Sequence, residues 1–236
     1  MKYKNIVEGK FISRPNRFIA HVEIDGVEHV VHVKNTGRCR ELLQPGATVY
    51  LEKSDNPARK TLYDLVSVMK GERIVNMDSQ LPNALVEEWL RESEAAREIF
   101  GDITFIKREK TYGKSRFDLY VESGERKIFI EVKGVTLEND NVVSFPDAPT
   151  ERGIKHLNEL VDALEYGYET YVFFVIQMED VDYFTPAWDK HKAFGDALVN
   201  AHNRGVKVLA YDCKVSEDEV SIRGNVRAEL SISKNM

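Results

Sequence analysis

Two charged residues interrupt an apolar stretch at residues 128–137, IFIEVKGVTL. Side chains alternate between the two faces of a β-strand, so Glu131 and Lys133 should share one face. The opposite face is apolar and carries Ile128, Ile130 and Val132. A carboxylate and an ammonium group are therefore expected side by side, fixed to a strand whose other face is buried.

A second carboxylate, Asp118, belongs to the preceding strand-like stretch, SRFDLYVES, and a glycine marks the turn between the two. If strands 115–122 and 127–136 pair as a hairpin, Asp118 lies close to Glu131 and Lys133. The sequence then places two carboxylates and one lysine at one edge of a sheet.

This set of groups suits metal-assisted hydrolysis of a phosphodiester. Two carboxylates, completed by waters and a phosphate oxygen, satisfy the oxygen preference of Mg²⁺, with Mn²⁺ as an alternative. We expect Asp118 and Glu131 to be metal ligands and catalytic residues, and Lys133 to position water or to neutralise developing charge. The alternative is a cross-strand ion pair on an exposed face, which contributes little stability.

The charge is unevenly distributed along the 236 residues, whose net charge is −6. Residues 1–80 hold 13 basic and 10 acidic side chains, whereas the remainder holds 20 and 29. A basic first third attached to an acidic remainder can indicate a module that binds polyanions, although ordinary fluctuation accounts for a difference of this size equally well.

The composition is that of a soluble globular protein, with 42% hydrophobic and 31% charged residues. No stretch has the ~20 apolar residues that span a bilayer, and the first residues lack the apolar run of a signal peptide. The two cysteines, Cys39 and Cys213, form neither a disulfide framework nor a zinc motif. We therefore expect a cytoplasmic protein with no membrane segment.

Residues 9–70 read as all-β, because short alternating runs are separated by closely spaced turn signals. Asp25-Gly26 predicts a tight hairpin, and Pro45-Gly46 and Asn56-Pro57 mark further turns. Four or five strands without a helix predict a small barrel or sandwich.

After residue 78 the pattern changes to α-β-β-β-α-β-α-β. The predicted elements are a helix at 81–100, strands at 103–113, 115–123 and 126–136, a helix from a Thr150 cap to 166, a strand at 170–178, a helix at 188–205, a strand at 207–215 and a hairpin at 218–233. We predict two domains, 1–78 and 79–236, and hence a two-domain α/β protein whose mixed central sheet is flanked by helices.

The order of elements, with Asp before Glu-x-Lys, resembles the PD-(D/E)xK superfamily and its restriction-endonuclease-like fold. More specifically, the chain resembles the sugar fermentation stimulation protein (SfsA) family. The segments that carry this resemblance are RPNRFIAHVEIDG at 14–26, NTGRCRELLQPG at 35–46, LPNALVEEWL at 81–90, SRFDLYVE at 115–122, IEVKGVTL at 130–137 and FPDAPTERGIKHLNEL at 145–160. Phe117 stands where the superfamily motif has a proline.

The resemblance implies an amino-terminal OB-fold, a nuclease-like second domain, DNA binding and a regulatory connection to sugar metabolism. Asp118, Glu131 and Lys133 match the metal-binding and catalytic positions. The superfamily often adds an acid from its first helix, and here Glu87 or Glu88 would fill that role.

The expected DNA contacts are basic, polar and aromatic residues of the barrel and of one helix. They are Arg14, Asn16, Arg17, Phe18, Asn35, Arg38, Arg40, Arg152 and His156. OB-folds bind nucleic acid through basic groups and stacking aromatics. The barrel residues can instead anchor an interdomain contact, and Arg152 and His156 can be a solvated surface pair.

The leading hypothesis is a DNA-binding protein with a Mg²⁺-dependent nuclease site, with the strandedness of the DNA and a homodimer left open. The alternatives are a regulator of sugar-fermentation genes that binds DNA without cleaving it, and a module whose charged strand face docks a protein partner.

Overall fold

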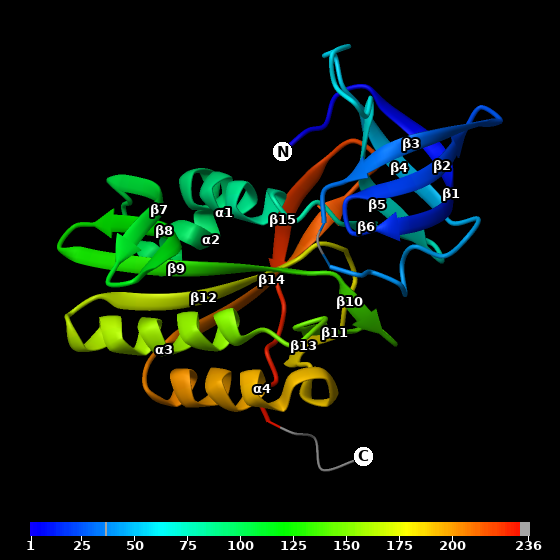
Figure 1. Cartoon of the computed structure of the whole chain (residues 1–236). Helices are drawn as coiled ribbons and strands as arrows, with labels where there is room; N and C mark the ends of the chain where they lie inside the picture. The colour runs from blue at the N-terminus through cyan, green and yellow to red at the C-terminus, as the bar shows by residue number, and fades with distance from the viewer. Residues whose placement is uncertain (36, 232–236) are drawn as a thin grey trace.

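The computed structural model describes residues 1–35 and 37–231 and contains a β-barrel followed by an α/β unit (Figure 1). The barrel unit contains the strands β1 (Ile6–Asn16), β2 (Ile19–Ile24), β3 (Val27–Val33), β4 (Thr48–Lys53), β5 (Tyr63–Lys70) and β6 (Arg73–Asn76). Their order is β3-β2-β1-β4-β5-β6, and a short parallel pairing of β3 with β5 closes the barrel over five strands. This is the predicted OB-fold.

The hairpin between β2 and β3 forms at Asp25-Gly26, as predicted. Both residues have positive φ, 51° and 76°, which a two-residue hairpin turn of this kind requires. Inward-facing residues such as Val22 and Val31 are fully buried, whereas Val30 on the outer face is exposed. The alternation seen in the sequence is thus the alternation between barrel core and solvent.

The second unit is built on a mixed six-stranded sheet in the order β15-β14-β12-β9-β8-β7. Its strands are β7 (Phe105–Tyr112), β8 (Ser115–Ser123), β9 (Arg126–Val135), β12 (Glu169–Ile176), β14 (Lys207–Val215) and β15 (Val220–Asn225). β9, β12 and β14 are parallel, and the outer neighbours are antiparallel. Residues 170–176 of β12 are all buried, as expected for a central strand covered on both faces.

Two pairs of helices cover the two faces of this sheet (Figure 1). α1 (Leu81–Glu92) and α2 (Glu94–Phe100) pack on Ile128, Ile130 and Val132. α3 (Glu151–Glu165) and α4 (Trp188–Asn203) cover the other face. The apolar face of β9 therefore faces α1, and Glu131 faces α3.

Helix boundaries agree with the sequence in one case and differ in another. The Thr150 side chain accepts a hydrogen bond from the Gly153 N–H (3.0 Å), which confirms it as the cap of α3. The single helix expected at 81–100 is wrong, because Ser93 is extended (ψ 135°) and divides it into α1 and α2. The Ser93 side chain makes no capping hydrogen bond, and its backbone N–H donates to the Trp89 carbonyl (2.9 Å), which closes α1.

A small third sheet was not predicted. It contains β10 (Leu137–Asn139), β11 (Val142–Phe145) and β13 (Tyr183–Pro186), and β11 pairs with β13 in parallel. The hairpin expected at 218–233 is only partly right, because β15 ends at Asn225 and pairs with β14; residues 232–233 lie outside the described part.

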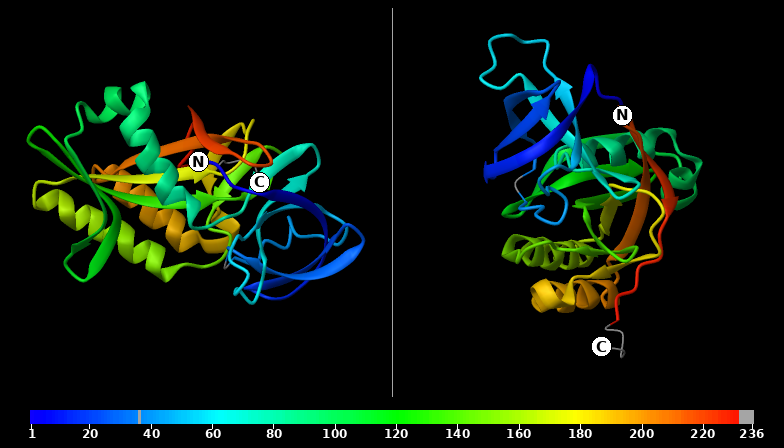
Figure 2. Two further views of the ribbon diagram at one scale, coloured as in Figure 1. Left: turned by 90° about the horizontal axis from the view of Figure 1, so that it is seen from above. Right: turned by 90° about the vertical axis from the view of Figure 1, so that its right-hand side faces the viewer.

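The barrel sits at the carboxyl ends of β9 and β12, as Figure 1 and the left view of Figure 2 show. The Gln177 carbonyl accepts from the Asn76 N–H (2.9 Å), and its side chain donates back to Asn76 Oδ1 (2.8 Å). Lys70 of β5 donates to the buried Glu138 carboxylate (2.5 Å). The boundary at residue 78 stays a prediction. Among the described helices, none has the length and hydrophobicity to cross a bilayer.

Candidate functional site

Asp118 lies where strands β8 and β9 stop pairing. The hairpin ladder was predicted correctly, but its last pair toward the barrel is Leu119 with Ile130. Beyond that pair, Asp118 Oδ2 accepts a hydrogen bond from the Val132 N–H (2.8 Å). The carboxylate thus satisfies a backbone donor that the ladder leaves free, and this bond fixes Asp118 beside β9.

The first helix reaches the site through an amide and not through an acid. Asn83 of α1 donates to Asp118 Oδ1 (2.9 Å). Glu87 pairs with Arg91 (2.8 Å) and Arg108, and Glu88 pairs with the amino terminus (3.0 Å). Both candidate acids are therefore engaged elsewhere, and Asn83 is a supporting residue that was not predicted from the sequence.

Glu131 is the most deeply buried acid of the site, with 2% of its surface exposed. Its Oε1 accepts from Lys133 Nζ (2.5 Å) and from the His156 ring. Its Oε2 is buried and has no hydrogen-bond partner among the described residues. An unpartnered carboxylate oxygen in a buried place costs free energy unless a ligand compensates it.

The pKa values of Asp118 and Glu131 depart in opposite directions from the ordinary values of these side chains. Burial raises the pKa of Asp118 above its ordinary value, and the charge of Glu131 adds to the effect. Burial also acts to raise the pKa of Glu131, but the hydrogen bond from His156 and the charge of Lys133 outweigh it and the pKa is lowered. Asp118 and Glu131 are therefore close enough to interact, as the predicted hairpin implied. Of the two, Glu131 is the acid held in its charged form.

His156 does not lie on the surface where we expected a DNA contact. Its side chain is buried, 5% exposed, and its Nδ1 bonds to Glu131. Arg152 Nε donates to the other ring nitrogen, Nε2 (3.4 Å). Because a guanidinium can only donate, Nε2 accepts and the proton on Nδ1 points to the carboxylate. The prediction of a phosphate contact by His156 is wrong, since α3 turns this side chain toward β9.

Three of the barrel residues that we predicted for DNA make internal hydrogen bonds. Arg14 donates to the backbone carbonyls of Arg17, Asn35 and Arg38 at 2.6–2.8 Å. Asn16 accepts from two backbone N–H groups of its own turn, and the Asn35 side chain donates to the Met77 carbonyl. These side chains fix the loops that carry the other predicted residues.

The remaining barrel residues point into solvent beside a groove of about 840 Å³. Arg17, Arg38 and Arg40 line it and are exposed, and the Arg17 guanidinium lies 5.9 Å from the ring centre of Phe18, which is 52% exposed. Its other wall is the segment 145–150, which leads into α3. We call this feature the arginine groove.

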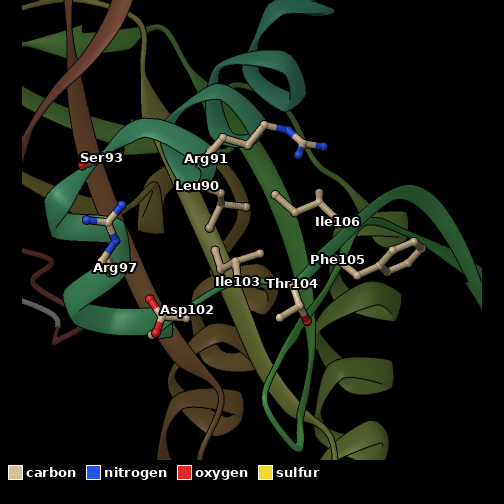
Figure 3. Close-up of a pocket in the computed structure, with 10 residues that line it drawn as sticks. Leu90, Arg91, Ser93, Arg97, Asp102, Ile103, Thr104, Phe105 and Ile106 are labelled. Atoms are coloured by element: carbon tan, nitrogen blue, oxygen red, sulfur yellow. The ribbon is translucent and has the colours of Figure 1, made fainter.

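A different cavity, of about 480 Å³, lies between α1, α2 and the start of β7 (Figure 3). Arg91, Arg97 and Asp102 are among its lining residues, and none of the residues that we predicted for the site lines it. Arg91 is already paired with Glu87. This cavity is therefore not part of the candidate site.

The site fits a hard divalent cation that keeps most of its waters. No group of three or more His, Cys, Asp and Glu side chains poised to hold a metal is found among residues 1–35 and 37–231. Mg²⁺ is usually bound through one or two carboxylates plus substrate phosphate, so such a group is not required. Asp118 and the unpartnered Glu131 Oε2 supply the two carboxylates.

Comparison with known proteins gives the same two-part organisation. A family model described as the SfsA N-terminal OB domain matches residues 12–77. A second, described as the sugar fermentation stimulation protein RE domain, matches residues 80–219. A sugar fermentation stimulation protein homolog from Ruminiclostridium cellulolyticum is 59% identical over 98% of this chain and 100% of its own.

A homolog of the same description from Desulfitobacterium hafniense is 58% identical over 98% of this chain and 99% of its own. Among solved structures, Pyrococcus furiosus SfsA in complex with Ca²⁺ superposes with a TM-score of 0.86 at 28% identity, covering 97% of this chain and 98% of that one. The chain therefore belongs to the sugar fermentation stimulation protein family.

Proposed function

We propose that this protein binds DNA and hydrolyses its phosphodiester bonds at a site formed by Asp118, Glu131 and Lys133, with Mg²⁺ as cofactor and Mn²⁺ as an alternative. The observation that carries the proposal is the buried, unpartnered Oε2 of Glu131, on the strand whose next residue, Val132, donates its N–H to Asp118 Oδ2 (2.8 Å). The Ca²⁺ in the Pyrococcus furiosus relative supports a divalent cation at a site of this family.

Each residue of the site has a distinct role in this proposal. Asp118 and Glu131 hold the cation, which when bound would supply Lewis-acid polarisation of the phosphodiester. Asn83 and the Val132 N–H orient Asp118, and His156 orients Glu131. The residues that carry and orient the two carboxylates all lie on strands or helices, which hold a site more precisely than loops do.

Lys133 would be the member of the site that changes its partner during the reaction. Its ammonium bonds to Glu131 Oε1, the same atom that His156 contacts. Because His156 remains on that oxygen, Lys133 can move to the attacking water or to a phosphate oxygen without leaving Oε1 unpaired. The lysine would then position the nucleophile and neutralise charge that develops in the transition state.

The arginine groove would carry the DNA backbone toward this site. Arg17, Arg38 and Arg40 are exposed donors, and Phe18 beside them offers a surface for base stacking. Arg152 is exposed at the start of α3, close to the site, and would contact phosphate near the cleaved bond.

A second candidate function is DNA-binding regulation of sugar-fermentation genes without cleavage. It is favoured by the pairing of Lys133 with Glu131, which leaves the lysine only 15% exposed. The description of the relatives links them to sugar fermentation. In this case Asp118, Glu131 and Lys133 would be present but would not catalyse cleavage.

A cleavage assay tests the proposal. Single- and double-stranded DNA and RNA are incubated with wild type in Mg²⁺, in Mn²⁺ and in EDTA, and Lys133→Ala is purified and assayed in parallel. We expect metal-dependent cleavage of DNA that the variant lacks. Equal residual cleavage in both proteins would indicate contamination and would rule out the enzyme.

Binding measurements separate the two candidates. DNA affinity without cleavage in any metal would favour the regulator. In both cases the logarithm of the affinity should fall with the logarithm of salt concentration, because arginine–phosphate contacts release counterions. Arg38→Ala and Arg40→Ala should each reduce that slope by about one. An affinity independent of salt would contradict both functions.

A further inference from the structure

A small pocket of about 180 Å³ lies where the barrel meets the carboxyl ends of β9 and β12. Among its lining residues are Asn35, Gly37, Gly134, Phe145, Asp147 and Gln177. Open α/β sheets bind ligands beyond the carboxyl ends of their parallel strands. We call this the junction pocket.

The junction pocket connects the proposed catalytic site with the arginine groove. Gly134 follows Lys133 directly in the chain. Gly37, Phe145 and Asp147 line both the pocket and the groove. A DNA strand whose phosphates follow the arginines therefore runs beside the pocket, one residue along β9 from Lys133. The presence of a DNA strand beside the pocket rests on the proposed function.

The pocket differs from the groove in charge. No lysine or arginine is among its described lining residues, and Asp147 is its one charged side chain. A phosphate would meet a carboxylate there without a compensating cation, which is unfavourable. A neutral ligand that makes hydrogen bonds fits this lining better.

Gln177 presents a fixed acceptor to the pocket. Its Nε2 donates to Asn76 Oδ1 (2.8 Å) and to the Asp78 carbonyl (3.1 Å), so the amide cannot flip without losing both bonds. Its Oε1 lies against Gly134, where an added Cβ would be only 2.5 Å away. Only glycine leaves room for this oxygen next to the strand.

Asp147 presents a second acceptor, its carboxylate. Its Oδ2 lies so close to Gly37 that an added Cβ there would be 2.7 Å away. The hydrogen bonds among the described residues include none to the Asp147 carboxylate and none to Gln177 Oε1. The Asn35 side chain, by contrast, is occupied by the Met77 carbonyl and the Gly37 N–H. The carboxylate of Asp147 and the amide oxygen of Gln177 thus favour a ligand with hydrogen-bond donors, beside the hydroxyl groups of Thr136 and Ser144.

We propose that the junction pocket takes one nucleobase turned out of the bound DNA strand and prefers guanine. Guanine presents adjacent N1–H and N2–H₂ donors that match a carboxylate in two parallel hydrogen bonds, whereas thymine has one N–H donor. The ring of Phe145, which is partly exposed on the wall, gives the base an aromatic surface. Base choice then accompanies cleavage at the neighbouring Lys133.

The test measures binding of fluorescein-labelled oligothymidylates by anisotropy in EDTA, so that no cleavage occurs. One strand has a single central guanine, a second has inosine, which lacks the N2 amino group, and a third has an abasic site. We expect the guanine strand to bind about 5- to 100-fold more tightly than the abasic strand, which is the discrimination of one good bidentate pair, with inosine between them.

Asp147→Asn should abolish the ratio of guanine-strand to abasic-strand affinity, whereas the loss of one negative charge beside the groove should raise affinity for all strands alike. Asp147 is exposed, so the change should not affect folding. The matched control is Asp140→Asn. Asp140 is an exposed carboxylate in the turn before β11, and asparagine tolerates its positive φ of 51° well. This variant should keep the preference for guanine.

The outcomes separate the pocket from the proposed function. Salt-dependent binding that is equal for all three strands, or a preference that Asp147→Asn leaves intact, overturns the pocket and leaves DNA binding standing. Absence of binding to every strand overturns both. A guanine preference lost only in Asp147→Asn supports the inference.

Discussion

The two ends of the central sheet both carry charged residues, but they pair them differently. At the amino ends of β9, β12 and β14, Glu169 uses both oxygens, one with Arg126 (2.6 Å) and the other with Arg126 and Lys207 (2.8 and 3.0 Å). At the carboxyl end, one oxygen of Glu131 receives two donors and the other receives none.

This contrast helps to distinguish a structural ion cluster from a site prepared for a ligand. Glu169 is about a third exposed, its partners are complete, and no further group is needed. Glu131 is almost fully buried, where an unpaired oxygen is most costly, and its donors are crowded on one side. The difference in pairing, and not the presence of charge, is what supports the proposed site at the carboxyl end.

Asp118→Asn should produce the largest effect. The substitution keeps the size of the side chain and an acceptor for the Val132 N–H, but it removes one of the two charges that are proposed to hold the cation. We expect cleavage to fall by about 10²–10³-fold, as for loss of one preorganised electrostatic group. Single-turnover rates on DNA at saturating Mg²⁺ measure this, and urea unfolding checks that the fold is intact. Undiminished cleavage would exclude Asp118 from the site.

His156→Phe should have the next largest effect. It removes the donor that orients Glu131 while it keeps a ring in the same space, and loss of such a supporting contact typically lowers metal affinity by about 10–100-fold. Titration calorimetry with Ca²⁺ measures the affinity without cleavage. His156→Asn, which retains a short N–H donor, should recover part of it. Equal Ca²⁺ affinity in all three proteins would show that His156 only fills space.

Arg126→Gln should affect stability and leave the chemistry unchanged. Glu169 would lose its bidentate partner, and because the pair is about one-third exposed, we expect a loss of only ~1 kcal/mol in the free energy of unfolding. Urea denaturation measures the loss, and cleavage by the folded variant should equal that of wild type. A fall in cleavage comparable to that of Asp118→Asn would remove the distinction between the two ends.

The pH dependence of the same cluster should be the smallest effect, because Glu169 is about a third exposed and solvent screens its ion pairs. The hydrogen bond from Arg126 is the main cause that lowers the pKa of Glu169 to about 2, from an ordinary value of 4.5. A lowered pKa in the folded state stabilises the protein fully above pH 4.5, and this contribution is lost as the pH falls toward 2. The stability difference between wild type and Glu169→Gln should therefore be constant near neutrality and shrink below pH 4.5. Urea unfolding between pH 7 and pH 3 measures it, and a difference that widens in acid would contradict the assignment.

Local patterns were sufficient to place the two carboxylates and the lysine. Alternation along residues 128–137 put Glu131 and Lys133 on one face, and the hairpin brought Asp118 beside them. Both inferences depend on contacts within about 20 residues along the chain, where periodicity and turn signals are informative.

The supporting contacts could not be read in the same way because they depend on how helices rotate against the sheet. His156 reaches Glu131 only through the packing of α3 on β9, although its spacing of four from the buried Leu160 was a sign that it faces inward. Asn83 precedes Glu87 by one helical turn, and the helix axis decides which of the two meets Asp118. The pairing of β11 with β13 is equally non-local.

The hydrogen bonds that join the barrel to the end of β12 also bear on how the chain folds. Separated from the barrel, the second unit would leave the Gln177 amide and the buried Glu138 carboxylate without their partners Asn76 and Lys70. Water would replace these partners in the isolated unit, so each lost hydrogen bond would cost about 0.5–1.5 kcal/mol, still a noticeable share of the stability of a domain. The two units should therefore melt together in one cooperative calorimetric transition, and neither half should be a self-sufficient module for transfer to another protein.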